Sequence, residues 1–137
     1  MRVQILRLEA RGPADFQRAF ESAAMWKVEA LLALSSPVFN SARKEIAELA
    51  MKHRLPTIMP FPGFADDGGL MAYGPHLSTL FRHAGTIMGK FLQGAQPRDI
   101  PIERPSRFEL AINLRTARVL GVTIPPSALL GADRVIE

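Results

Sequence analysis

Residues 29–40 read EALLALSSPVFN, and within this segment Ala30 to Leu34 form a continuous run of apolar side chains. The run is bounded by Ser35, Ser36 and Pro37, which are residues that interrupt regular structure. Strands that are covered on both faces have this near-continuous apolar character, and they are typical of parallel sheets. We therefore expect a strand over residues 29–35 that is buried from both sides.

Similar segments lie before and after this run at a regular interval. Residues 2–9 and 55–60 are further short stretches that favour strands, and residues 15–26 and 41–53 carry apolar side chains at helical spacing. The strand candidates begin near residues 2, 29 and 55, and an interval of about 26 residues suits right-handed crossovers between parallel strands. The pattern predicts the α/β class, with a three-layer, largely parallel sheet in a single domain over residues 1–137.

After residue 60 the pattern changes. Residues 60–75 are a Gly- and Pro-rich loop with a short strand near 70–73. Residues 76–93 are the clearest helix of the chain, because they carry a broad apolar stripe and are followed by Gly94. The stripe consists of Leu77, Leu80, Phe81, Ala84, Ile87, Met88, Phe91 and Leu92.

The C-terminal part resumes with an alternating strand. A linker with three prolines, residues 95–106, leads into residues 107–114, in which apolar and polar side chains alternate strictly. This alternation predicts a half-buried strand. Its buried face is expected to carry Phe108, Leu110, Ile112 and Leu114. A short helix over residues 116–120 then ends at Gly121.

Composition narrows the function classes. The net charge is +4, but the basic residues are scattered among acids, whereas a nucleic-acid interface needs a basic stripe with stacking aromatics, so we expect no nucleic-acid partner. The absence of cysteine removes disulfides and thiolate chemistry. No segment approaches the roughly 18 apolar residues of a membrane span, so we expect no membrane insertion. The N-terminus has neither the apolar core nor the cleavage site of a signal peptide.

Metal and catalytic motifs are weak. His76 and His83 are about 10 Å apart on one helix, too far to share a metal, and His53 ends another helix, so all three are best read as surface residues. The segment Asp66-Asp67-Gly68-Gly69 lacks the spacing of a calcium or phosphate loop and predicts a turn. We therefore expect no metal, no cofactor and no catalytic residue.

Polar and aromatic residues follow the strands instead. In open α/β sheets ligands bind beyond the carboxyl ends of parallel strands. Those ends carry hydroxyl, amide and aromatic groups and little charge, which is typical of a recognition surface. The candidate ligand-binding residues are Ser36, Phe39, Asn40, Phe61 and Tyr73.

Four segments resemble one protein family. EIAELAMKHRLP (45–56), GGLMAYGP (68–75), KFLQGAQPRDIPIE (90–103) and the final thirty residues from Phe108 are similar, in order, to ABC-transporter substrate-binding proteins that include tryptophan- and tyrosine-type receptors. The resemblance implies one lobe of a type I periplasmic-binding-protein fold, in which two Rossmann-like lobes close on a small solute that is delivered to an ABC permease. Members of the family carry an earlier lobe and usually an export signal, so the chain is expected to be a C-terminal portion. The resemblance implies a periplasmic protein, whereas the absence of a signal peptide from the chain as given leaves a cytoplasmic location open.

By correspondence with the family, the five candidate residues face the interlobe cleft. Members often have an acidic or amide residue just after the strand that matches Ala30–Leu34, where it meets a ligand amino group. This chain has Ser36 there and Asn40 further on. The resemblance implies a small, amino-acid-like ligand, and the chain departs from the family at the position that meets the ligand amino group.

Two other functions stay open. The first is a folded remnant of a truncated gene that forms a homo-oligomer without a transport role. The second is a small α/β hydrolase-like enzyme that uses Ser36.

An isolated lobe is expected to bind solute weakly, because only half of the cleft contacts are present. Residues 76–93 are expected to pack on a partner lobe or on a second copy, which makes a homodimer the expected state.

Overall fold

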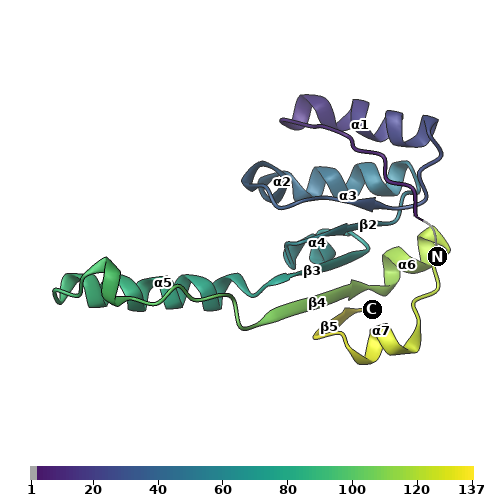
Figure 1. Ribbon diagram of the computed structural model, residues 1–137. Helices are drawn as coiled ribbons and strands as arrows, with labels where there is room; N and C mark the ends of the chain where they lie inside the picture. The colour runs from purple at the N-terminus through teal and green to yellow at the C-terminus, as the bar shows by residue number, and fades with distance from the viewer. Residues whose placement is uncertain (1–2) are drawn as a thin grey trace.

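The computed structural model describes residues 3–137, and in this range five strands form one sheet in the order β1-β2-β3-β4-β5. Three of its pairings are parallel, and only β3 and β4 run antiparallel. Helices flank the sheet, so the predicted α/β class is confirmed (Figure 1). The strands are β1 (Leu31–Leu32), β2 (Thr57–Met59), β3 (Met71–Pro75), β4 (Phe108–Asn113) and β5 (Arg134–Ile136); the helices are α1 (Pro13–Met25), α2 (Pro37–Ser41), α3 (Arg43–Lys52), α4 (Gly63–Asp66), α5 (Leu77–Leu92), α6 (Leu114–Leu120) and α7 (Pro126–Leu130), with a 3₁₀ turn at Pro97–Asp99.

The hydrophobic core lies on one face of the sheet. Alternate strand residues point to this face, among them Met59, Ala72 and Ala111, all fully buried. The helices α1, α3 and α4 cover them with buried apolar side chains. These are Phe16, Phe20, Ala23, Ile46, Ala47, Ala50, Phe64 and Ala65. The small residues Ala72 and Ala111 let α4 approach the strands closely, which explains why Phe64 is buried completely.

The opposite face, which we call the second face, carries one apolar row across all five strands. The row is defined by the strand register and consists of Leu32, Ile58, Met71, Ile112 and Val135. Ile112 is fully buried, but Leu32 is 67% exposed at the β1 end. The expected burial of the first apolar run from both sides is therefore wrong, because the second face is uncovered near β1.

The predicted strand over residues 2–9 is also wrong. Residue 2 lies outside the described residues, and residues 3–9 are extended without strand pairing. A strand exists only where a neighbour accepts its hydrogen bonds. The predicted strands over 29–35 and 55–60 are confirmed as shorter elements, β1 and β2, and they pair in parallel as expected.

The buried face of β4 is the reverse of the predicted one at its start. Phe108 is half exposed, whereas Glu109, Ala111 and Asn113 are buried. Asn113 explains part of this choice, because its side-chain amide donates to the Ala65 carbonyl (2.9 Å) and its side-chain oxygen accepts from the Thr116 N–H (3.0 Å). One buried amide thus caps α6 and ties α4 to the sheet.

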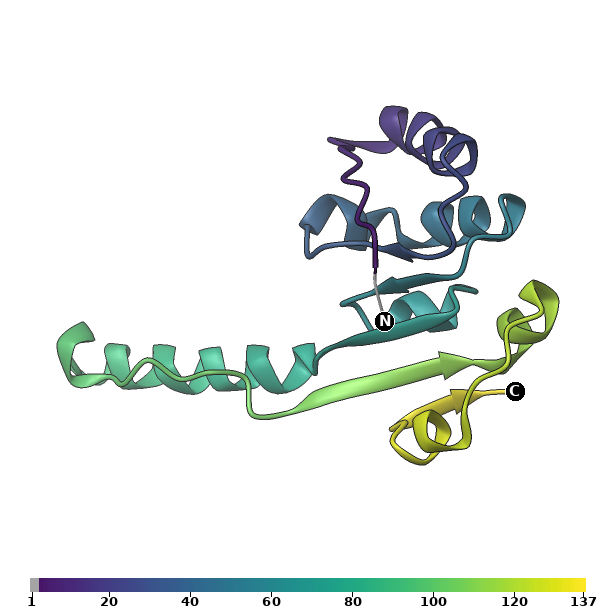
Figure 2. The same cartoon turned by 45° about the vertical axis from the view of Figure 1, so that its right-hand side comes forward.

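The predicted helix over residues 76–93 is confirmed as α5, and it projects from the body of the molecule (Figures 1 and 2). The chain returns beside it through residues 94–107, and together they form the arm. The His76 N–H donates to the Arg107 carbonyl (3.1 Å) where the arm joins the sheet. No side chain of α5 is buried.

The end of β3 lies directly against the loop after β2, and this contact requires glycine. A Cβ at Gly74 would lie 1.9 Å from the Pro60 carbonyl oxygen, a backbone atom that cannot rotate away. We expect Gly74→Ala to lower the free energy of unfolding by about 2–4 kcal/mol through overpacking. Urea denaturation measures the loss, with Gly12→Ala as the control, because that site has open space and the change should cost less than about 1 kcal/mol. Equal stability of the two variants would contradict this contact.

Candidate functional site at the carboxyl edge of the sheet

Three strand ends meet at one edge of the sheet. Because β1, β2 and β3 run parallel, their carboxyl ends lie on the same side. Ser36 follows β1 and Phe61 follows β2, whereas Tyr73 is the central residue of β3 itself. The contact of Gly74 with Pro60 draws the end of β3 and the segment after β2 together. The segments that carry Ser36 and Phe61 therefore leave the sheet at one edge.

The polar candidates lie on α2. Ser36 is the N-cap residue, and its backbone carbonyl accepts from the Asn40 N–H (3.0 Å), but its hydroxyl makes no capping hydrogen bond. Asn40 is half-buried, and its backbone oxygen accepts from the Arg43 guanidinium (3.2 Å). Within residues 3–137 neither the Ser36 hydroxyl nor the Asn40 side-chain amide has a hydrogen-bond partner. Two half-buried polar groups are thus free to meet an external ligand.

Phe39 has a different position from the one that its sequence context suggests. Its ring packs edge-to-face on Phe16 of α1, with ring centroids 5.7 Å apart and an interplanar angle of 70°. It also contacts the core. Phe39 therefore fixes α2 against α1, and through α2 it holds Ser36 and Asn40 in place.

Aromatic rings continue along the edge. Phe61 is half-buried against the core, and its carbonyl accepts from the Phe64 N–H (2.8 Å) at the start of α4. Tyr73 is 54% exposed and stacks on Phe108, with ring centroids 5.7 Å apart and 24° between the ring planes. The pair offers an exposed aromatic surface where the arm leaves the sheet.

A charged cluster lies on the helix-covered face beside this edge. Arg134 donates to both carboxylate oxygens of Asp66 (2.7 Å each) and lies 3.1 Å from Glu109. The hydrogen bond to Asp66 raises the pKa of the Arg134 guanidinium above its ordinary value, and the charges of Asp66 and Glu109 act in the same direction, although partial burial opposes them. Glu109 is nearly buried, and this guanidinium is the closer of its two partners, because His76 Nε2 lies 3.9 Å from the other carboxylate oxygen. The cluster joins α4, β4 and β5.

The motifs weighed for metal or phosphate have structural roles. Asp67 pairs with Arg43 (2.6 Å), Gly68 has φ +97°, and a side chain at Gly69 would collide with the Phe64 ring. His76 caps α5 by accepting from the Thr79 N–H. Among the described residues no group of three or more His, Cys, Asp or Glu side chains could hold a metal ion.

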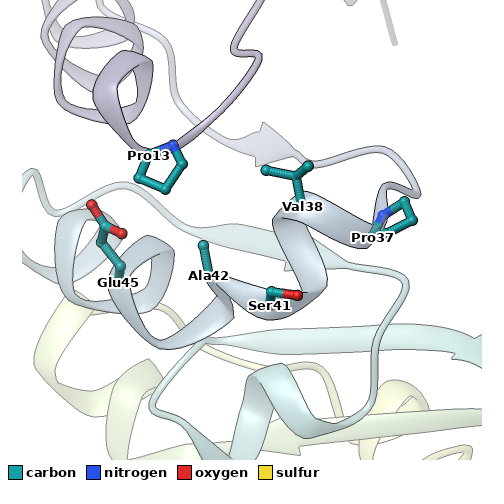
Figure 3. A pocket seen from close by; sticks show the side chains of 6 residues that line it. All are labelled: Pro13, Pro37, Val38, Ser41, Ala42 and Glu45. Atoms are coloured by element: carbon teal, nitrogen blue, oxygen red, sulfur yellow. The ribbon is translucent and has the colours of Figure 1, made fainter.

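One depression of the surface lies away from the edge. It has a volume of about 500 Å³, and it opens widely to solvent between the start of α1 and the helices α2 and α3 (Figure 3). Its lining is mostly apolar and includes Pro13, Val38 and Glu45, but none of the five candidate residues. It is a groove between helices and not a formed ligand pocket.

Two residues at the edge were not predicted from the sequence. The alternation places Phe108 on the buried face, whereas the structure leaves it half exposed, and it gives no role to Glu109, which is buried. The register of β4 with β3 places Phe108 opposite Pro75 and Glu109 opposite Gly74. An acidic residue within an otherwise apolar strand was the one available signal of a buried ion pair.

Solved structures share this fold. The chain superposes on a conserved domain protein from Vibrio cholerae O1 (TM-score 0.83, 23% identity, 92% of this chain and 42% of that one). It also matches an ABC domain in complex with L-Trp from Streptococcus pneumoniae (TM-score 0.82, 24% identity, 93% and 44%). A ligand-free, open substrate-binding protein with adhesive properties from Clostridium difficile is more distant (TM-score 0.61, 19% identity, 90% and 41%). The chain thus spans less than half the length of the structures that it matches.

The fold and the edge define an α/β domain of the periplasmic-binding-protein-like class. A family model described as ABC transporter substrate binding protein matches residues 1–136. The chain belongs to this family, which is a class of substrate-binding proteins and not of enzymes. No curated protein matches the chain. No helix within residues 3–137 is long and apolar enough to cross a bilayer.

Removal of the Arg134 guanidinium should destabilise the fold. Arg134→Gln removes the guanidinium that lies closest to the nearly buried Glu109 carboxylate, and we expect a loss of roughly 1–3 kcal/mol in the free energy of unfolding. Arg98→Gln is the matched control, because the side chain of Arg98 is 85% exposed. Urea denaturation of both variants at neutral pH is the measurement, and a loss at Arg134 no larger than at Arg98 would show that the cluster does not stabilise the protein.

Proposed function

We propose that this chain is the solute-binding lobe of an ABC-transporter receptor and that it contacts its ligand at the carboxyl edge of β1, β2 and β3. The observation that carries the proposal is the free Ser36 hydroxyl and free Asn40 amide on the same edge as the exposed Tyr73 ring. Phe61 completes the aromatic lining, and Phe39 supports α2 from behind. This arrangement supports recognition, because it has donors, acceptors and ring faces without an acid–base pair.

The ligand that these groups favour is a small, amino-acid-like molecule. The Tyr73–Phe108 stack suits a flat or apolar side chain. Ser36 and Asn40 are neutral, so they cannot form an ion pair with an amino group. Their side-chain oxygens accept hydrogen bonds that the amino group donates. One structural neighbour is described as holding L-Trp, which makes aromatic amino acids the first ligands to test.

The same proposal implies the transport partners. A solute-binding lobe delivers its ligand to an ABC permease on the outer side of a membrane, which makes the periplasm the working compartment. The chain spans less than half of its structural neighbours, so high-affinity capture requires a second lobe that closes over the edge.

A second candidate function is a homo-oligomer without a transport role, and the arm favours it. Phe81, Met88 and Leu92 are all more than half exposed on α5. Each such side chain forfeits roughly 1.5–3 kcal/mol of burial in a monomer. Contiguous exposed apolar surface of this kind marks an interface. We propose that α5 packs on a second copy of the chain. The chain is then a homodimer both as a solute-binding lobe and as a protein without a transport role.

Solute binding is tested by titration of the ¹⁵N-labelled chain with L-Trp, L-Tyr and branched amino acids. We expect a weak interaction with a Kd in the range of roughly 0.1–10 mM, because only one side of the cleft is present. The amide shifts should move at residues 36, 38–40, 61 and 73, and Asn40→Ala should remove them.

Gln17→Ala, which removes an exposed amide on α1, is the matched control and should leave the titration unchanged. A panel that produces no shifts at this edge would refute the amino-acid-like ligand. Sub-micromolar binding to a monomer would refute the requirement for a second lobe.

The oligomeric state is tested by light scattering at micromolar concentration. The mass of one chain is 15.1 kDa, and we expect about twice that value. Phe81→Glu should shift the mass toward the monomer, because it puts a charge in the centre of the apolar stripe of α5. Thr86→Glu introduces the same charge on the opposite side of the helix and should leave the mass unchanged. A monomeric wild-type chain would contradict the homodimer.

A further inference from the structure

Helix α2 carries the polar candidates, but its own contacts hold it weakly. It has five residues, and none of them is buried. A helix this short is not stable by itself, so its position depends on what it touches. The packing of Phe39 on Phe16 is one such contact. One ring contact still lets a helix turn about it, so a second anchor is needed to fix the directions of Ser36 and Asn40.

Helix α4, in the segment that follows β2, is anchored firmly. Phe64 and Ala65 are fully buried in the core. The Asn113 side-chain amide donates to the Ala65 carbonyl (2.9 Å), and the Thr116 hydroxyl donates to the Gly68 carbonyl just beyond α4 (2.8 Å). These hydrogen bonds join α4 to β4 and α6. Helix α4 is therefore a fixed point for any side chain that contacts it.

One guanidinium connects the two helices. Arg43 is the first residue of α3, and its Nη1 donates to the Asn40 carbonyl in the last turn of α2 (3.2 Å). Its Nε lies 2.6 Å from Oδ2 of Asp67, the residue that ends α4. The same Nε also lies close to the start of α4, because a Cβ added at Gly63 would be 3.1 Å from it. The Arg43 side chain is thus held between both ends of α4 and the end of α2.

The charges at this point are already compensated within the protein. Asp67 pairs with Arg43, and the neighbouring Asp66 pairs with Arg134 of β5. The two adjacent acids at the end of α4 therefore anchor different parts of the fold. Because protein groups already engage the Arg43 guanidinium, this residue affects a ligand through the groups that it holds and not through its own charge.

We infer that Arg43 is a positioning residue of the carboxyl edge, which fixes the segment after β1 to the segment after β2 and so orders Ser36 and Asn40 relative to Phe61. The inference rests on the proposed solute site and adds the residue that orders it. Loops that become ordered only on binding lower the affinity, and a site that is ordered beforehand avoids this cost. The planar fork of an arginine can hold two partners in one geometry, whereas a lysine ammonium is a single point charge.

Arg43→Met tests the ordering of α2, because it keeps an aliphatic stem and removes both polar contacts. In the free chain we expect the ¹⁵N order parameters of residues 36 and 38–41 to fall from about 0.85 to below about 0.6. Arg18→Met is the matched control, because it breaks an Arg–Asp pair of similar length (2.8 Å) on α1. The control should leave these order parameters unchanged.

The same variant should bind solute more weakly. In a titration with L-Trp below saturation, the initial slope of the amide shifts at residues 61 and 73 is inversely proportional to Kd. We expect Arg43→Met to lower this slope by roughly fivefold, because binding must then order α2. Arg18→Met should keep the slope of the wild type.

Arg43→Lys separates positioning from stability. The ammonium can still pair with Asp67, so we expect it to restore most of the urea midpoint that Arg43→Met loses. It cannot hold the Asn40 carbonyl at the same time, so the titration slope should remain as low as in Arg43→Met. Stability and solute binding that recover together would show that Arg43 is only structural, and this result would overturn the inference.

The order parameters need no ligand, so they separate this inference from the proposed function. If residues 36 and 38–41 stay ordered in Arg43→Met, the inference is wrong even when the wild type binds amino acids. A wild-type chain without shifts at the edge would refute the proposed solute site. Increased mobility of these residues in Arg43→Met would then still assign the ordering of α2 to Arg43.

Discussion

The sheet is covered completely on only one of its two faces, and this determines the organisation of the molecule. Met59, Ala72 and Ala111 point into a core that α1, α3 and α4 close completely, whereas the alternate residues point to a face that is buried only toward β4. Because strand side chains alternate, the same register that builds the core also aligns the exposed apolar row. The exposure of Leu32 at the β1 end follows from this arrangement.

The elements predicted correctly from the sequence are those whose signal is local. Apolar residues at helical spacing, followed by Gly94, predict α5. The short apolar runs predict β1 and β2, and the interval between them predicts their parallel pairing. The expected strand over residues 2–9 fails for a non-local reason: its composition favours a strand, but no neighbour offers a hydrogen-bonding edge. On β4 both faces carry apolar residues, so alternation alone cannot tell which is buried.

The candidate site also has features that the sequence predicts and features that only the tertiary structure shows. Its location at the carboxyl edge follows from the strand order, and the sequence is sufficient for that. The orientation of Phe39 depends on Phe16, which is 23 residues earlier, and the burial of Glu109 depends on Arg134, which is 25 residues later. Such pairings arise from tertiary packing, and a single sequence does not contain them.

The edge strand β1 has only two residues, and this brevity has a consequence for solubility. Leu31 and Ala33 donate their N–H groups to the Pro56 and Ile58 carbonyls of the neighbouring strand, so only Leu32 directs its backbone groups outward. A longer free edge beside exposed leucines would template the stacking of chains into fibrils. The ladder ends at Ala33, and Pro37 follows soon after it, which limits the contact that another strand can make. The apolar surface beside β1 can therefore associate through side chains, while the backbone resists amyloid-like growth.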